Sequence, residues 1–413
     1  MGISRRHFVA GGLGGCLCCA VPPALANLLS TNLQPLMSQD YAPADADERG
    51  LWQACGKLEQ DIAESDLVLP APDLQAYTVE VVERLIGRPA TELRVYIMRD
   101  SSFNASMTPS GMMMVHTGFL ARVHNEAQFA AVIGHEAGHY FRKHMLERWR
   151  DQRQKLAITA FVGAGANAAG GYSAMQGYNG QSWIDLANSI NQALVMSIFS
   201  FSRAQEAEAD AYGIGLMVKS GYTPQAAGEV WRQLIDEGKA SAAARDKKYK
   251  DHAVSAYSTH PPSADRMVDL TDTANEAVRR GLVSAPTDRR EEWRRTIAPY
   301  MPMLLEQQVK LNDPGASLYI IDGHAREGWT GTLRYYEGEV YRIRNEPGDM
   351  AKATQSYAAA IAFPDAPPEA WKAHGYALLK AGQREPGHEA LNRYLELKPN
   401  AKDAAMVRFA LGQ

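Results

Sequence analysis

Alternation between apolar and polar positions predicts helices and two short strands in the first third of the chain. Residues 47–65 and 73–85 place apolar side chains at helical spacing, which predicts two amphipathic helices packed on a core. Residues 93–97 alternate apolar and polar side chains as a half-buried strand does, and residues 112–116 follow a Pro-Ser-Gly turn as a second strand. A small sheet flanked by helices is therefore expected here.

A helix near residue 130 carries an apolar stripe formed by Phe129, Val132 and Ile133. Asn125 is its predicted N-cap, with Gln128 as the capping-box partner. Further helices are expected over three ranges, 185–219, 223–234 and 263–281. Because helices outnumber strands, the predicted fold class is α+β, mainly α.

Residues 282–413 differ from the preceding part because short motifs recur in them. Pro-Gly pairs recur at 314–315, 347–348 and 386–387, with spacings of 33 and 39 residues. Tyr357 and Tyr394 lie 37 residues apart, as do Gly338 and Gly375. Small and aromatic residues that recur at such a period are typical of the contacts between the paired helices of helix hairpins. This α-helical domain therefore resembles tetratricopeptide (TPR-like) repeats. The alternative is an irregular helical cap.

Residues 1–26 have the pattern of an export signal. A twin-arginine motif at residues 4–9 precedes an apolar stretch, and an Ala-Leu-Ala cleavage site follows. A competing interpretation makes residues 13–16 a lipobox with an acylated Cys16. The predicted location is the periplasm, with residues 27–45 as a loose leader. A cytoplasmic protein with an incidental arginine pair is a third interpretation.

Composition narrows the class of protein. The 413-residue chain is 46% hydrophobic and 22% charged with a net charge of −4, which is typical of a globular protein and lacks the basic excess of nucleic-acid binders. Three of its four cysteines fall inside the predicted signal, so Cys55 has no partner for a disulfide in the mature chain. The longest apolar run beyond the signal, 156–166, is too short to span a membrane. We expect no nucleic-acid partner and no transmembrane segment in the mature chain.

The helix near residue 130 also contains a His-Glu-x-x-His motif. His135 and His139 are four residues apart, so both imidazoles can reach one ion from the same helix face. Glu136 lies beside the first histidine, where it can take a proton from water as a general base. The motif can also arise by chance on an amphipathic helix, so a third ligand is needed to support a metal site.

The best candidate for the third ligand is Glu206. It lies in the alanine-rich segment 202–210, whose helix propensity places Asp210 on the same face one turn later. Asp210 is expected to hold a ligand histidine from outside the coordination shell, whereas Glu208 is off that face and predicted to be solvated. The segment alone is typical of a charged surface helix, but with two histidines it predicts a zinc centre.

These residues resemble a family of zinc endopeptidases that includes HtpX, the CAAX prenyl endopeptidase and BepA. The resemblance spans about residues 90–270 and rests on HExxH, on segment 202–210, and on Thr-His-Pro-Pro at 259–262 leading to Arg266. It implies a gluzincin-like zinc metallopeptidase domain with a small edge sheet over residues 46–281. The chain departs from HtpX-like relatives, which are membrane-embedded.

The resemblance also implies a site. One zinc ion per chain would be held by His135, His139 and Glu206, with Glu136 as the catalytic residue. The residues expected to support these ligands from outside are Asp210, Arg203 and Arg266. The resemblance places His260 in the cleft, either as a regulatory fourth ligand that blocks the zinc or as an oxyanion donor.

A strand beside such a helix can pair its free edge with an extended polypeptide. The predicted substrate-binding residues are Met112, Met113, Met114 and Val115. By resemblance, the expected substrates are misfolded or misassembled envelope proteins, and the repeats are expected to dock an envelope partner. The alternative is a chaperone or assembly factor that binds through its repeats and whose zinc site is latent.

Overall fold

The computed structural model describes residues 41–154, 201–250 and 264–413. These ranges contain mostly helices and one three-stranded sheet, which confirms the predicted α+β, mainly α class. No helix within them is both long and apolar enough to cross a membrane. The predicted export signal, the apolar run 156–166 and His260 lie outside the described residues.

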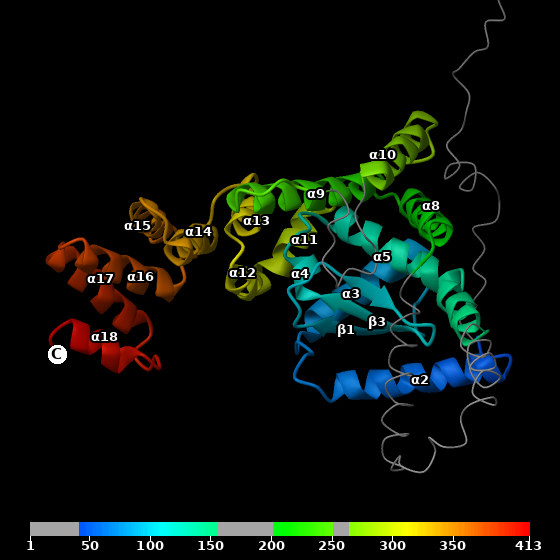
Figure 1. The fold of residues 1–413 in the computed structure, drawn as a ribbon, viewed down its shortest axis with the longest axis horizontal. Helices are drawn as coiled ribbons and strands as arrows, with labels where there is room; N and C mark the ends of the chain where they lie inside the picture. Colours follow the sequence, from blue (N-terminus) through cyan, green and yellow to red (C-terminus); the bar gives the residue numbers. More distant parts are fainter. Residues whose placement is uncertain (1–40, 155–200, 251–263) are drawn as a thin grey trace, which may run out of the picture.

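The N-terminal part combines helices with the sheet (Figure 1). Its helices are α2 (Ala46–Ala63), α3 (Pro72–Ile86), α4 (Thr117–Leu120), α5 (Glu126–Phe141), α8 (Arg203–Lys219), α9 (Ala226–Ala244) and α10 (Ala264–Arg279), and its strands are β1 (Arg94–Met98), β2 (Ala105–Met107) and β3 (Met112–His116). The predicted amphipathic helices coincide with α2 and α3, and the predicted strands with β1 and β3. Strand β2 was not predicted because three residues are too few to show an alternating pattern.

Strand β3 is the centre of the sheet, whose order is β1-β3-β2. It pairs in parallel with β1 and antiparallel with β2. Met113 and Val115 face the main hydrophobic core, while Met114 points to the other side and packs on a smaller cluster. The prediction that Met112, Met113, Met114 and Val115 offer a free edge is therefore wrong, because both sides of this strand are already paired within the sheet.

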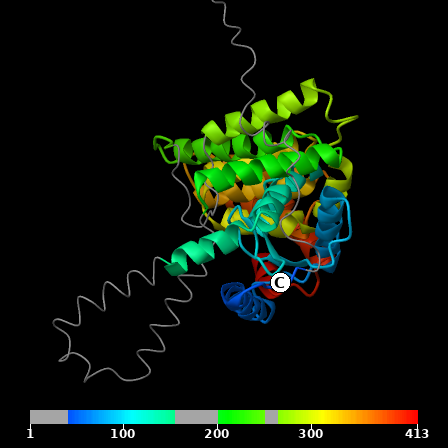
Figure 2. The same cartoon turned by 90° about the vertical axis from the view of Figure 1, so that its right-hand side faces the viewer.

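Helices cover both faces of the sheet. The main core joins the sheet to α3, α5, α8 and α9, and it includes Leu74, Phe129 and Trp231. On the other face, α2 contributes Leu51 and Cys55 to a cluster with residues that follow α5. Figure 2 shows α10 lying along α9, with which it makes most of its contacts. Helix α5 is thus enclosed by neighbouring elements, and its histidines are held away from bulk water.

The C-terminal part consists of successive helices joined by short connections. They are α11 (Arg290–Ile297), α12 (Met301–Lys310), α13 (Pro314–Ala325), α14 (Gly331–Arg344), α15 (Asp349–Ala360), α16 (Pro368–Lys380), α17 (Arg384–Leu397) and α18 (Ala404–Ala410). Helices α14 and α15 pack as one pair, and α16 and α17 as another. A side chain at Gly338 would collide with the Tyr357 ring, and one at Gly375 would lie 2.8 Å from Leu391. The recurring glycines therefore leave space in which bulky side chains of the next helix pack.

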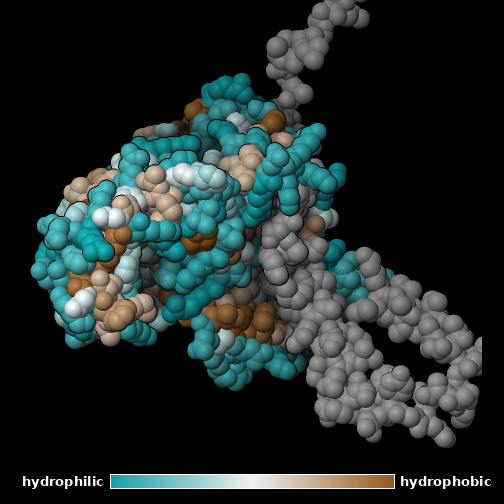
Figure 3. Space-filling model, turned by 60° about the vertical axis from the view of Figure 1, so that its left-hand side comes forward, coloured by the Kyte–Doolittle hydropathy of each residue, from teal (hydrophilic) through white to brown (hydrophobic). Residues whose placement is uncertain are grey.

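The surface of this part is mostly hydrophilic on the face drawn in Figure 3, with apolar residues in scattered patches. Exposed apolar side chains on the last helix include Met406 and Phe409. Of the three recurring Pro-Gly pairs, one begins α13, one precedes α15 and the third lies in the first turn of α17. Proline is tolerated there because the first-turn N–H groups have no partner within the helix.

The hydrophobic core does not stop at the predicted domain boundary of residue 281. Trp293 and Ile297 of α11 and Leu304 of α12 are buried in the same core as Phe129 of α5. The Trp293 ring stacks on Phe129 with 5.0 Å between ring centroids, and its indole N–H donates to the carbonyl of Val123 at 3.0 Å. Helix α11 therefore packs as part of the N-terminal unit, although its charged sequence gives little sign of this.

Replacing Trp293 with alanine is expected to lower the free energy of unfolding by about 3–5 kcal/mol, because it removes the largest fully buried side chain from the core around α5. Urea denaturation followed by circular dichroism measures the loss. Trp329→Ala is the matched control, since Trp329 is only partly buried and contacts Arg334, so its loss should cost roughly 1 kcal/mol or less. Equal losses in the two variants would show that α11 is not anchored in the core.

Candidate metal centre

Helix α5 has the N-cap that the sequence predicts, but Gln128 does not complete the predicted capping box, because its side-chain oxygen accepts from the N–H of His124 at 2.9 Å. The Asn125 side chain accepts a hydrogen bond from the backbone N–H of Gln128 at 2.8 Å, which caps the first turn. The helix then continues through both histidines of the HExxH motif to Phe141. His135, Glu136 and His139 are all buried, because the sheet and the neighbouring helices enclose this part of α5.

Glycines let α8 approach α5 closely. A Cβ atom at Gly138 would lie 2.9 Å from the carbonyl oxygen of Ala209, and one at Gly213 would lie 2.9 Å from the backbone nitrogen of His135. Any side chain at these positions would push the helices apart. The backbones instead come into direct contact, so the side chains of Glu206 and Asp210 reach the histidines.

The three predicted ligands come together in this contact. The Nε2 atoms of His135 and His139 are 3.0 Å apart. Glu206 places one carboxylate oxygen 3.5 Å from His135 Nε2 and the other 3.7 Å from His139 Nε2. One donor atom from each residue lies within 4.8 Å of the other two. Among the described residues, this is the group of histidine and carboxylate side chains arranged to hold a metal ion.

The donor set fits zinc. Zinc in proteins is bound by imidazole nitrogen and carboxylate oxygen in tetrahedral geometry, at roughly 2.0–2.1 Å, which places adjacent donors about 3.3 Å apart. The observed separations of 3.0, 3.5 and 3.7 Å bracket that value. Three protein ligands leave one position of a tetrahedron for a substrate or water, as in hydrolytic sites.

Asp210 and Arg266 surround the first ligand. Asp210 lies 2.8 Å from His135 Nδ1, on the side of the ring that faces away from the donor group. The Arg266 guanidinium forms two 2.7 Å contacts with Asp210 and lies 2.9 Å from Glu206. It also stacks 4.1 Å from the centroid of the Trp231 ring. Two of the three predicted supporting residues, Asp210 and Arg266, are therefore in place, and Arg266 connects Asp210 to the predicted ligand Glu206.

Charge in this buried cluster controls protonation. Burial alone would raise the pKa of Asp210, but the charge of Arg266 and the hydrogen bonds donated by Arg266 and His135 outweigh burial, lower the pKa and keep the carboxylate ionised. Burial, together with the charge of Arg266, lowers the pKa of His135 below its ordinary value. Neutral imidazole is the form that binds metal, so the lowered pKa of His135 favours metal binding.

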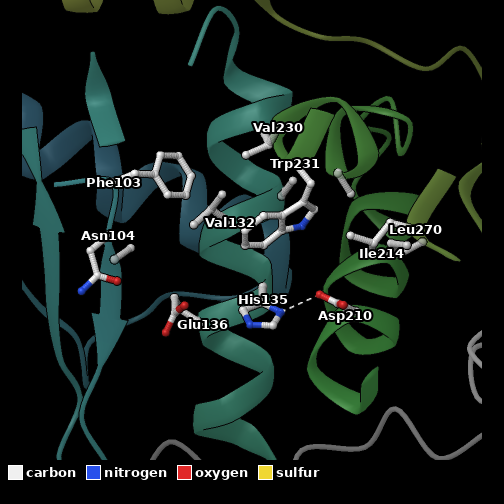
Figure 4. Close-up of a pocket in the computed structure, with 13 residues that line it drawn as sticks. Phe103, Asn104, Val132, His135, Glu136, Asp210, Ile214, Val230, Trp231 and Leu270 are labelled. Carbon is white, nitrogen blue, oxygen red and sulfur yellow. Dashed lines mark ion pairs between the residues drawn. The ribbon is translucent and has the colours of Figure 1, made fainter. Parts of the chain in front are cut away.

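A pocket lined mainly by apolar side chains opens beside Glu136 (Figure 4). Phe103, Val132 and Trp231 point into it, and His135 and Glu136 form its polar end. The remaining lining residues include Ile214, Val230 and Leu270. An apolar cavity that ends at a carboxylate is suited to receive an apolar side chain of a bound molecule.

Strand β2, which the sequence did not reveal, borders this pocket. Asn104 and Ala105 line its wall. The carbonyl of Asn104 accepts from the N–H of His116 at 3.1 Å, and the N–H of Thr108 donates to Met112 at 2.8 Å. Because successive peptide groups in a strand alternate in direction, those of Ala105 and Met107 point away from β3. Within the described part of the chain, β2 is the edge of the sheet nearest α5.

The predictions for two charged residues of α8, Arg203 and Glu208, need correction. Arg203 is exposed at the first residue of the helix and, within the described ranges, has no ion pair or hydrogen bond with the site, which contradicts its predicted supporting role. Glu208 is not simply solvated, because it contacts both Arg142 and His144 across the helix interface. His144 itself is buried against His139, a position that the sequence did not indicate. The two roles predicted for His260 stay predictions.

Comparison with known proteins covers the same part of the chain. Residues 69–274, which include the donor group and both supporting residues, match peptidase family M48. The chain is similar to a putative beta-barrel assembly-enhancing protease of Vibrio cholerae, with 22% identity over 266 residues, covering 63% of this chain and 51% of that protein. It is similar to the mitochondrial metalloendopeptidase OMA1 of Schizosaccharomyces pombe, with 28% identity over 204 residues, 49% of this chain and 53% of that one. It is also similar to metalloprotease LoiP of Escherichia coli K12, with 27% identity over 241 residues, 57% of this chain and 83% of that one. The chain thus spans about half the length of the first two relatives.

Proposed function

Residues 69–274 make this chain a member of peptidase family M48, and from that premise we propose that it is a zinc-dependent endopeptidase. The observation that carries the proposal is the buried group of His135, His139 and Glu206 with Glu136 beside it on α5. Relatives named as metalloproteases and metalloendopeptidases support the same class of reaction.

Glu136 and Asp210 have separate roles in the proposed hydrolysis. When bound, zinc supplies Lewis-acid chemistry, which polarises a peptide carbonyl and makes water a stronger acid. Glu136 accepts a proton from the attacking water and delivers it to the leaving amine nitrogen, as the C–N bond breaks. Asp210 accepts a hydrogen bond from the Nδ1–H of His135 and so keeps the Nε2 lone pair of that ring directed at the donor group.

The substrate we propose is an extended polypeptide with an apolar side chain next to the scissile bond. The apolar pocket ends at Glu136, so a side chain bound there belongs to a residue adjacent to the bond that is cut. We propose that the peptide groups of Ala105 and Met107, which point away from β3 and are buried in the chain alone, pair with the extended backbone of the substrate. This role replaces the one predicted for β3.

The wider role is proposed from the sequence and from one relative. The predicted twin-arginine signal favours export to the periplasm, with lipidation at Cys16 as the alternative. The Vibrio cholerae relative is named as a putative protease that enhances beta-barrel assembly, and we propose that this chain acts on misfolded or misassembled envelope proteins. The helix pairs of residues 331–397 supply a surface that could dock an envelope partner.

A direct test is cleavage of casein, an unfolded substrate, by the full chain. Cleavage should stop when a chelator removes the metal and return when zinc is restored. Cleavage that survives complete metal removal, or a zinc-loaded protein that does not cut casein, would overturn the proposal.

Enlarging the side chain at Val132 tests the apolar pocket. Val132 is one turn before His135 on α5, and Val132→Phe should fill the space beside Glu136 while every ligand side chain is kept. We expect cleavage next to large apolar residues to fall about 10–200-fold relative to cleavage next to alanine, which is the range for steric discrimination in an apolar pocket. Mass spectrometry of peptide-library products measures the ratio. Val132→Thr, of similar shape, is the control, and an unchanged ratio in Val132→Phe would exclude the pocket from substrate binding.

A further inference from the structure

The two histidines of the donor group are supported by different partners. His135 directs Nδ1 at the carboxylate of Asp210. His139 directs Nδ1 at another histidine, with 2.9 Å between His139 Nδ1 and His144 Nδ1. His144 is 1% exposed and is not part of the donor group. The support of His139 is therefore a neutral ring in place of a carboxylate.

The hydrogen-bond direction follows from the donor geometry. The Nε2 atom of His139 lies within the donor group, so a bound metal requires its lone pair there. The proton of a neutral His139 is then on Nδ1 and is donated to His144 Nδ1. The proton of His144 is consequently on Nε2, which lies 3.3 Å from a carboxylate oxygen of Glu208. Arg142 binds the other oxygen of Glu208, so the chain of hydrogen bonds ends on an ion pair.

A local break in the helix brings His144 to this position. Helix α5 ends at Phe141, and Lys143 has a left-handed backbone with φ of 59°. The chain turns there before it becomes helical again at residue 144. On a continuous helix, side chains five residues apart would not meet, but the turn brings the edge of the His144 ring against His139, with 5.0 Å between ring centroids. Phe201 stacks on His139 at 3.7 Å between centroids, so the ring is held by both contacts.

We propose that His144 is a positioning residue for metal binding. By accepting a hydrogen bond from the Nδ1–H of His139, it fixes the ring orientation and the tautomer that present Nε2 to zinc. Glu208, held by Arg142, orients His144 in turn. Partners of this kind typically change metal affinity 10–100-fold when they are removed. The inference rests on the proposed zinc site, but it makes a separate claim about which side chain supports the second ligand.

Matched variants of His144 separate hydrogen bonding from packing. His144→Phe keeps a ring of similar size but has no acceptor, whereas His144→Asn places an oxygen where Nδ1 lies now. Zinc dissociation constants of the full chain are measured by competition with a chromophoric chelator. We expect His144→Phe to bind zinc about 10–100-fold more weakly than wild type, and His144→Asn to recover most of that loss. The visible spectrum of the cobalt-loaded protein should change in the same order.

Controls make each outcome decisive. His324→Phe removes another partly enclosed histidine, one that donates to the carbonyl of Ala121, and its zinc affinity should equal that of wild type. If His144→Phe does not fold, the smaller His144→Leu takes its place. If zinc affinity falls equally in the apolar and Asn variants, His144 acts only through packing and the proposal is overturned. Unchanged zinc affinity in both variants would overturn it as well. A wild-type protein that binds no zinc would instead refute the proposed function.

Discussion

Glu136→Gln is expected to abolish peptide hydrolysis while the protein keeps its zinc. Glutamine is almost the same size as glutamate but cannot accept a proton at neutral pH, so the attacking water loses its base. Removal of a general base typically slows turnover about 10²–10⁴-fold. Glu136 does not belong to the donor group, so metal binding should be unaffected. Casein cleavage and zinc content, measured on the same sample, give both results.

The same variant distinguishes the enzyme from a binding protein. If the repeats of the C-terminal part carry the main role, Glu136→Gln should still complement a strain that lacks the protein. If peptide cleavage carries it, complementation should fail although the variant is folded and loaded with zinc. Substantial casein cleavage by Glu136→Gln would remove Glu136 from its proposed role as the base.

Glu206→Ala is expected to lose the metal itself. The substitution removes the one anionic donor and leaves two imidazoles. It also leaves the Arg266 guanidinium, now 2.9 Å from Glu206, without that partner and close to the position of the cation. Because supporting residues outside the ligand shell already change affinity 10–100-fold, loss of a ligand should weaken zinc binding by more than about 100-fold.

Elemental analysis after dialysis against a weak chelator measures this loss. Glu136→Gln is the matched control, since it changes a neighbouring buried glutamate that is not a donor. We expect about one zinc per chain in Glu136→Gln and close to none in Glu206→Ala. Equal zinc content in the two variants would contradict the assignment of Glu206 as a ligand.

The donor group and its partner Asp210 were predictable because the residues on each helix follow from helical spacing. His135 and His139 are one turn apart on α5, and Glu206 and Asp210 are one turn apart on α8. Spacing within a helix is a local property, so the sequence shows it directly. That the two helices meet depends on glycines such as Gly138, whose role is visible only when the partner helix is known.

The support of His139 by His144 and Glu208, and the strand order, could not be predicted in the same way. Glu208 lies off the donor face of α8, which predicted solvation, but its partners Arg142 and His144 belong to the segment that follows α5. The turn at Lys143 removes the periodicity that would have placed His144. The position of β3 in the middle of the sheet depends on β2, a strand of three residues. Each of these features is set by contacts between distant parts of the chain.

The most direct test of the account is an anomalous difference map from crystals of the wild-type protein, recorded on both sides of the zinc absorption edge. We predict one zinc peak per chain, at roughly 2.0–2.2 Å from His135 Nε2, His139 Nε2 and a carboxylate oxygen of Glu206. A map from zinc-saturated crystals with no peak at these three residues, or with its peak elsewhere, would contradict the account.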